Sequence, residues 1–141
     1  MQIRRATPKD ALSLQQLINE AFHRTTDAPI CGSYFESSER LTLVASEGEK
    51  ILATASIHFL QKLDRKMGQI EDVVVHPKAQ GLGLGRQVVQ ALLTEAQSKE
   101  CYKIVLNTAE KTAPFYEKMG FEKGYSLTSI NNNNSKGFSP K

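Results

Sequence analysis

The stretch Gln80-Gly81-Leu82-Gly83-Leu84-Gly85-Arg86 lies between two apolar segments of different periodicity. Before it, Ile70-Glu71-Asp72-Val73-Val74-Val75 has the composition of an apolar strand with two acids near its start. After it, Val88 to Leu93 carries apolar residues at helical spacing. A strand, a glycine-rich turn and a helix in this order form a cradle for anions, because backbone N–H groups of the turn and the helix dipole favour negative charge there. The segment therefore predicts a phosphorylated cofactor.

Spacing indicates which cofactor suits this loop. The dinucleotide pattern G-x-G-x-x-G fails because Arg86 occupies its last position, and the chain has no G-x-x-x-x-G-K-[ST] phosphate loop. The pattern that is present, Gln80-x-x-Gly83-x-Gly85, resembles the coenzyme A pyrophosphate loop of the GNAT superfamily of N-acetyltransferases. By itself this pattern also suits a plain turn between a strand and a helix.

Composition restricts the class of protein. The chain has 141 residues, enough for one domain, with 18 Lys+Arg against 15 Asp+Glu and a net charge of +3. This small, scattered surplus argues against a nucleic-acid binder. The nearest basic cluster, Lys62, Arg65 and Lys66, suits an ordinary solvated loop. Cys31 and Cys101 lie far apart, so we expect no metal site and a reducing cytoplasm, and we expect no membrane span.

Local signals predict the first half of the fold. Ile3–Arg5 suits a short strand, and Thr7 with Asp10 suits a capping box for a helix. That helix places one apolar stripe on the core: Leu14, Leu17, Ile18, Ala21 and Phe22. Residues 41–46 alternate as a half-buried strand, which a turn at 47–50 returns into a strand over 51–60.

The second half alternates helices and strands. After the polar loop 61–67 and the strand 70–75, we expect the following elements: a helix to about Lys99, a buried strand Tyr102–Leu106, a helix Thr112–Met119 and a strand Phe121–Ile130. The order β-α-β-β-β-α-β-α-β predicts a mixed α/β, three-layer domain over residues 1–130. Residues 131–141, rich in asparagine, are predicted to be a flexible tail.

A second motif strengthens the resemblance. Ala113-Pro114-Phe115-Tyr116-Glu117-Lys118-Met119-Gly120-Phe121 is similar to the late GNAT motif, a tyrosine on a short helix before Gly-Phe. The chain therefore resembles the GNAT fold, which implies a mixed central sheet of about six or seven strands with flanking helices. Residues 70–75, 101–104 and 115–118 look like those of the glucosamine-6-phosphate N-acetyltransferases.

The chain departs from that pattern in three places. The family usually has an acid where this chain has Asn107, and an asparagine where it has Thr112. It commonly ends in an arginine-bearing strand that helps to hold the substrate across a dimer, whereas residues 127–131 here contain no arginine. The cofactor half of the pattern is kept and the sugar-phosphate half is partly lost.

The resemblance implies acetyl-CoA as co-substrate and assigns its contacts. Backbone groups of the valines, near a bulge, would bind the pantetheine arm and the thioester carbonyl, and the glycine loop would bind the pyrophosphate. The predicted cofactor-binding set is Val73, Val74, Val75, Gln80, Gly81, Leu82, Gly83, Leu84, Gly85, Arg86, Thr112 and Tyr116.

Tyr116 is the candidate general acid for the departing thiolate, because a phenol with a pKa of ~10 is protonated at neutral pH. Its alternative role is packing between Phe115 and Phe121. Glu71 and Asp72 are adjacent, so on a regular strand they point to opposite faces. We predict that they bind the substrate ammonium and accept its proton, with Asn107 as a further substrate contact.

Two histidines suit less direct roles. His58 and His76 are expected at the surface or a strand edge, and His76 remains a second candidate for the base because it lies close to the glycine loop.

Two classes of function follow. One is an acetyl-CoA-dependent N-acetyltransferase in which a primary amine attacks directly, since no Cys or Ser lies in a nucleophile motif. The other is a non-catalytic acetyl-CoA-binding module, which Asn107 in place of an acid favours. Glucosamine 6-phosphate, amino acids, polyamines and protein N-termini stay open as acceptors. The basic loop 62–66 is a candidate contact for a sugar phosphate, and the family suggests a homodimer.

Overall fold

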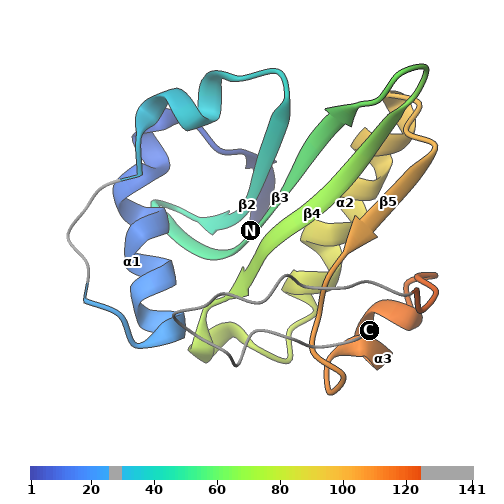
Figure 1. Ribbon diagram of the computed structural model, residues 1–141. Helices are drawn as coiled ribbons and strands as arrows, with labels where there is room; N and C mark the ends of the chain where they lie inside the picture. Colours follow the sequence, from blue (N-terminus) through green and yellow to red (C-terminus); the bar gives the residue numbers. More distant parts are fainter. Residues whose placement is uncertain (26–29, 125–141) are drawn as a thin grey trace, which may run out of the picture. The chain divides into compact units, whose positions relative to one another are not determined.

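The computed structural model describes residues 1–25 and 30–124. The chain forms two compact units, Met1–Asn107 and Thr108–Lys141. The first unit holds one sheet in the order β1-β2-β3-β4-β5, with α1 and α2 beside it (Figure 1). Among the described residues, no helix is long and apolar enough to cross a membrane. The predicted boundary at residue 130 and the tail 131–141 lie outside the described part of the chain.

The sheet is mixed, as predicted. Its strands are β1 (Gln2–Arg5), β2 (Arg40–Glu47), β3 (Lys50–Gln61), β4 (Lys66–Val75) and β5 (Lys103–Leu106). Successive strands pair antiparallel from β1 to β4, and β5 pairs parallel to β4. The described residues give five strands rather than six or seven. Most of the predicted strand Phe121–Ile130 lies outside them, and residues 121–124 form no strand.

The helices follow the predicted order. They are α1 (Ala11–Phe22), α2 (Leu84–Ser98) and, in the second unit, α3 (Ala113–Glu117). Short 3₁₀ turns are η1 (Pro8–Asp10), η2 (Gly32–Glu36) and η3 (Pro77–Ala79). β4 ends at Val75, just before Pro77, which lacks a backbone donor for a ladder.

The predicted cap lies on η1, the 3₁₀ turn that leads into α1, and an ion pair supports it. Asp10 accepts a hydrogen bond from the backbone N–H of Thr7 at 2.8 Å. Arg4 on β1 donates to both Asp10 oxygens at 2.9 Å. The Arg4 guanidinium lowers the pKa of the buried Asp10 carboxyl, against the opposing effect of burial, and the Thr7 N–H adds to the lowering. The cap and the pair together tie β1 to η1.

β2 is covered on both faces. Every residue from Leu41 to Ser46 is buried, so the prediction of a half-buried strand is wrong. On one face Val44 packs with Leu14 and Leu17 of α1. The opposite face contacts α2, whose Val88, Val89 and Leu92 are fully buried. A three-layer unit buries both faces of a central strand, which Thr42 and Ser46 on one face of that strand did not indicate.

Two further burial predictions are corrected. Phe22, predicted on the core stripe of α1, is 53% exposed, because the helix ends there and His23 adopts a left-handed conformation. The predicted buried strand Tyr102–Leu106 is half-buried, and Tyr102 itself is 43% exposed. Among the described strands β5 lies at the edge of the sheet, so only part of its surface is covered.

Candidate functional site

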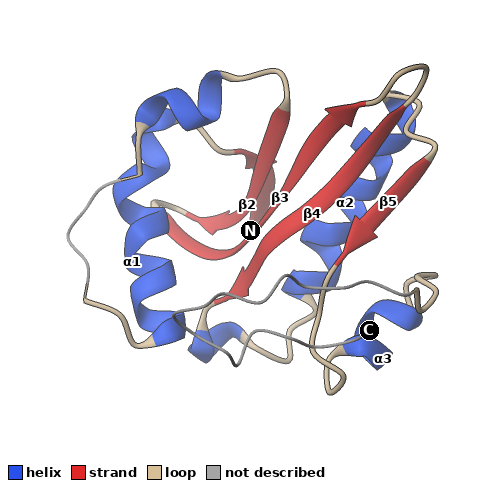
Figure 2. Cartoon of the chain, viewed as in Figure 1, coloured by secondary structure: helices blue, strands red, loops and turns tan. Residues whose placement is uncertain are grey.

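The pairing between β4 and β5 ends partway along β4. The last partners are Ile70 on β4 and Leu106 on β5. Beyond them Val74 and Val75 pair only with β3 within the described residues. Figure 2 shows the two strands adjacent at one end and diverging toward the other. In the described part of the chain, the side of β4 that faces away from β3 therefore has no strand partner along this stretch, which leaves backbone groups for a ligand.

A β-bulge lies where the strands part. Thr54 is opposite Val74 and Ser56 is opposite Glu71, so Asp72 and Val73 together face a single residue of β3. Asp72 has a φ of 55°, a left-handed conformation that aspartate tolerates better than most residues. The bulge redirects the Asp72 side chain at the end of the paired region.

The predicted acids lie together on this bulge. Glu71 and Asp72 are both exposed, and Glu71 accepts a hydrogen bond from Gln69 at 3.0 Å. The prediction that they point to opposite faces depended on regular alternation, which the bulge interrupts. Asn107 directly follows Leu106, the partner of Ile70, so it leaves the sheet next to Glu71. The three predicted substrate contacts are therefore neighbours along the backbone of this region.

The glycine loop connects this strand to α2. Gly81 and Gly83 have φ values of 84° and 78°, where side chains other than glycine are strained, and a Cβ at Gly81 would meet nothing within 4 Å. Gly83 is the N-cap, and the first helical hydrogen bond runs from the N–H of Gln87 to its carbonyl at 3.1 Å. The N–H groups of residues 84–86 therefore precede the helical ladder. Of the predicted loop set, Leu84 and Gly85 are buried, and these are exposed: Gln80, Gly81, Leu82, Gly83 and Arg86.

His76 lies between β4 and η3, just before the glycine loop. It is 6% exposed, so its predicted surface position is wrong. Its Nδ1 accepts the backbone N–H of Lys78 at 3.1 Å, which places the proton on Nε2, and Nε2 contacts the Glu20 carboxylate of α1. Because both ring nitrogens are engaged, His76 is poorly placed to serve as a general base.

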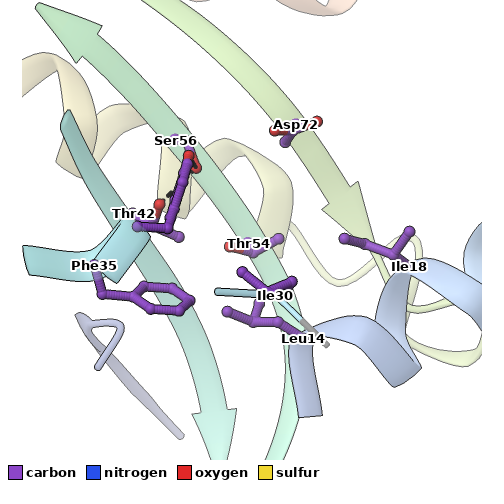
Figure 3. A pocket seen from close by; sticks show the side chains of 9 residues that line it. Leu14, Ile18, Ile30, Phe35, Thr42, Thr54, Ser56 and Asp72 are labelled. Carbon is purple, nitrogen blue, oxygen red and sulfur yellow. Dashed lines mark hydrogen bonds between the residues drawn. The ribbon is translucent and has the colours of Figure 1, made fainter. Parts of the chain in front are cut away.

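A pocket opens on the α1 face of the sheet, beside the bulge (Figure 3). Its apolar wall comes from α1 and the segment around η2, its floor carries hydroxyl groups, and Asp72 is its charged residue. The lining residues are Leu14, Ile18, Ile30, Tyr34, Phe35, Thr42, Thr54, Ser56 and Asp72. Sequence reasoning missed all of these except Asp72. A signal existed, because Thr54, Ser56 and His58 repeat at every second position of an apolar strand and so share one face.

The second unit carries Tyr116. Its ring makes edge contacts with Phe115 and Phe121, at centroid distances of 4.9 and 5.9 Å. Burial raises the pKa of the phenol, so it stays protonated at neutral pH. Thr112 is exposed, and its hydroxyl donates to the carbonyl of Ala109 at 3.0 Å. The packing role weighed for Tyr116 is therefore present, and it is compatible with a proton donor.

The basic loop lies away from the bulge. Lys62 and Arg65 flank the tip of the β3–β4 hairpin, and Lys62 Nζ donates to the Tyr102 hydroxyl at 3.0 Å. Lys66 begins β4, six residues before Asp72, which corresponds to roughly 20 Å along a strand. This loop is thus at the wrong end of the sheet to meet, within one chain, the phosphate of a sugar whose amine lies at Asp72.

Comparisons with known proteins agree with this architecture. A model described as "Acetyltransferase (GNAT) family" matches residues 10–121. The chain is 44% identical over 75 residues to a glucosamine 6-phosphate N-acetyltransferase of Trypanosoma brucei brucei, covering 51% of this chain and 51% of that protein. A solved Trypanosoma brucei acetyltransferase has a TM-score of 0.79 at 30% identity, covering 92% of this chain and 98% of that one. For glucosamine-6-phosphate N-acetyltransferase from Arabidopsis thaliana the TM-score is 0.78 at 27% identity, covering 93% and 97%.

The fold is that of an acyltransferase domain with a mixed sheet and helices on both of its faces. The chain belongs to the acetyltransferase (GNAT) family, because the family model matches most of its length. This confirms the resemblance read from its two motifs. The chain spans about half the length of the curated relatives it matches.

Proposed function

We propose that this protein transfers the acetyl group of acetyl-CoA to a primary amine. The observation that carries the proposal is the parting of β4 and β5 beyond Ile70 and Leu106, at the strand that leads into the glycine turn. The free side of β4 suits the amide-bearing pantetheine arm. The unpaired N–H groups at the start of α2 suit the pyrophosphate, and the exposed Arg86 adds positive charge.

The chemistry is direct attack. The neutral amine attacks the thioester carbonyl, the C–S bond breaks, and an amide and free coenzyme A result. Glu71 and Asp72 are the proposed acceptors of the proton from the substrate ammonium, and Tyr116 is the proposed donor to the departing thiolate. Asn107 beside Glu71 is a proposed acceptor contact, since an amide binds polar groups but does not act as a base. Thr112 and Tyr116 are proposed cofactor contacts on the strength of their motif.

Glucosamine 6-phosphate is the proposed acceptor. Relatives at 44% and 42% identity over about half of the chain carry the name glucosamine 6-phosphate N-acetyltransferase. We also propose a homodimer, which the family resemblance suggests, in the cytoplasm, which the two separated cysteines suit. A non-catalytic acetyl-CoA-binding module is the second candidate, favoured by Asn107 at the position where the family usually has an acid.

Thiol release separates the two candidates. The protein is mixed with acetyl-CoA and, in separate reactions, glucosamine 6-phosphate, glucosamine, an amino acid, a polyamine and a peptide N-terminus. A transferase releases free thiol with at least one amine and yields the N-acetyl product by mass spectrometry. Binding of acetyl-CoA without thiol release in any reaction would reject the transferase and leave the binding module.

A further inference from the structure

We infer that Arg40 forms the anion-binding end of the pocket beside the bulge, opposite Asp72. The pocket then suits a hydroxylated primary amine that carries an anionic group on the side away from the amine, as in an amino-sugar phosphate. This inference rests on the proposed function and identifies which residues of this chain take the role of the arginine missing from residues 127–131.

The strand register puts these groups on one polar face. Arg40 pairs with His58, and Thr42 pairs with Ser56, on β2 and β3. Residues two apart on a strand share a face, as do directly paired residues. Thr42 and Ser56 line the pocket, so Arg40 and His58 lie on the same face, one row further from the bulge.

The spacing suits a molecule of sugar size. Arg40 and Glu71 are separated by two strand spacings across the sheet and one two-residue step along it, because Ser56 pairs with Glu71. With about 4.8 Å per strand and about 6.7 Å per step, their Cα atoms lie roughly 12 Å apart. Side chains on one face stand roughly perpendicular to the sheet, so the two side chains rise from the sheet at points separated by about the length of a sugar phosphate.

Tyr34 holds the guanidinium at the pocket. Arg40 Nε donates to the Tyr34 carbonyl at 2.8 Å, and its Cζ lies 4.6 Å from the centroid of the Tyr34 ring. The Tyr34 hydroxyl in turn contacts Ser56 Oγ at 3.3 Å and His58 Nε2 at 3.4 Å. Tyr34 therefore lines the pocket and also orients Arg40, which leaves the two terminal amino groups of the guanidinium to face an anion.

Among the described residues Arg40 has no compensating acid. Within residues 1–25 and 30–124 it forms no ion pair, whereas Arg4 is paired with Asp10 and Arg65 with Asp64. A fixed, unpaired guanidinium with a planar fork of donors is the group that recognises phosphate or carboxylate in a bidentate manner.

The middle of the pocket combines apolar walls with buried hydroxyl groups that are hydrogen-bonded to one another. Thr42 Oγ1 and Ser56 Oγ lie 2.7 Å apart, and each hydroxyl both donates and accepts. Leu14, Ile18 and Phe35 supply apolar surface for the C–H face of a ring. Figure 3 shows these apolar side chains and the hydroxyl groups arranged around the same space, with Asp72 at one side.

Calorimetric titration of glucosamine 6-phosphate and of glucosamine tests the assignment. The wild-type protein should bind the phosphorylated sugar at least tenfold more tightly. Arg40→Gln should bring the two affinities within threefold, while Arg65→Gln, at the hairpin tip, should leave the tenfold preference. Arg40→Lys keeps the positive charge but loses the planar pair of donors. Its preference for the phosphorylated sugar should therefore be at least threefold smaller than that of the wild type, and still larger than that of Arg40→Gln. If Arg40→Gln fails to fold, the reduced phosphate preference of Arg40→Lys tests the assignment in its place.

Three outcomes would overturn the assignment of Arg40. These are an unchanged preference for the phosphorylated sugar in Arg40→Gln, a loss of that preference in Arg65→Gln, or a wild type that binds both sugars equally or binds neither. Acetyl transfer is measured separately. Thiol release with glucosamine and equal binding of both sugars would retain the transferase and reject Arg40. A phosphate preference that Arg40→Gln removes, without any thiol release, would retain Arg40 and reject the transferase.

Discussion

The imidazole of His76 contacts the carboxylate of Glu20, so the turn before the glycine loop is fastened to α1. α1 also supplies Leu14 and Ile18 to the pocket. The same helix therefore borders the proposed acceptor site and contacts the turn that leads into the proposed cofactor loop. The second ring nitrogen caps η3 through the N–H of Lys78.

His76→Ala tests whether this residue positions the loop or acts as a base. The variant loses both contacts, and we expect KM for acetyl-CoA to rise about tenfold while kcat stays within about threefold. Glu20→Gln keeps an acceptor for the Nε2 proton and should change KM much less. Steady-state kinetics at saturating amine distinguishes the two roles. A fall in kcat of about 10² with KM unchanged would identify a general base instead.

Tyr116→Phe tests the proton donor. The ring contacts with Phe115 and Phe121 survive the change, so stability and acetyl-CoA binding should hardly alter. Turnover should fall by about 10² or more if the phenol protonates the thiolate. Tyr102→Phe, at an exposed tyrosine directly before β5, serves as the control and should retain its turnover. Turnover of Tyr116→Phe within about threefold of wild type would leave Tyr116 a packing residue.

We expect the hydroxyl of Tyr102 to have a lower pKa than an ordinary tyrosine. Lys62, which donates to its hydroxyl, together with Arg65 and Lys103 lowers the pKa of Tyr102 to about 8, against the opposing effect of burial. Tyrosinate absorbance should therefore show a first step near pH 8 that is missing in Tyr102→Phe. In Lys62→Ala the step should move toward the ordinary value of about 10. A wild-type titration without any step below about pH 9.5 would contradict the cluster.

Asp10→Asn should destabilise the fold in a pH-dependent manner. The pKa of Asp10 is lower in the folded state than the unfolded value of about 3.9, so its contribution to stability is complete above that pH and is lost as pH falls through the folded value. We expect a loss of about 1–3 kcal/mol at pH 7, shrinking below about pH 4. Urea unfolding across pH measures it. Asp64→Asn, on an exposed pair, should show little effect, and a pH-independent loss in Asp10→Asn would contradict the pair.

Much of the fold could be predicted because its signals are local. The Thr7–Asp10 cap, Pro77 after β4 and Gly83 before α2 each act through the backbone of their own segment. The order of elements follows from these positions and from periodicity. Burial of both faces of β2 could not be predicted this way, because it depends on two helices from distant parts of the chain.

The site was predicted less completely, because its geometry depends on which residues of neighbouring strands pair. The resemblance implied a bulge near the valines, but its exact position at Asp72 follows only from the pairing of Thr54 and Ser56 with their partners on β4. The same pairing places Lys66 at the far end of the strand, although it is near Asp72 in sequence. Arg40 carries no motif, and its position beside Tyr34 arises from the fold alone.

The central claim, that the loop from Gln80 to Arg86 holds acetyl-CoA, is tested most directly by a ligand-induced shift in Tm for Gly83→Val. Gly48→Val is the matched control, because Gly48 has a similar φ of 62° in the β2–β3 turn, with nothing near its missing Cβ. At about 100 times its dissociation constant, acetyl-CoA should stabilise the wild type by about 2.7 kcal/mol, which corresponds to a rise in Tm of roughly 5–10 °C. We predict that Gly48→Val keeps this rise and Gly83→Val loses it while remaining folded. A full rise in Gly83→Val would contradict the claim.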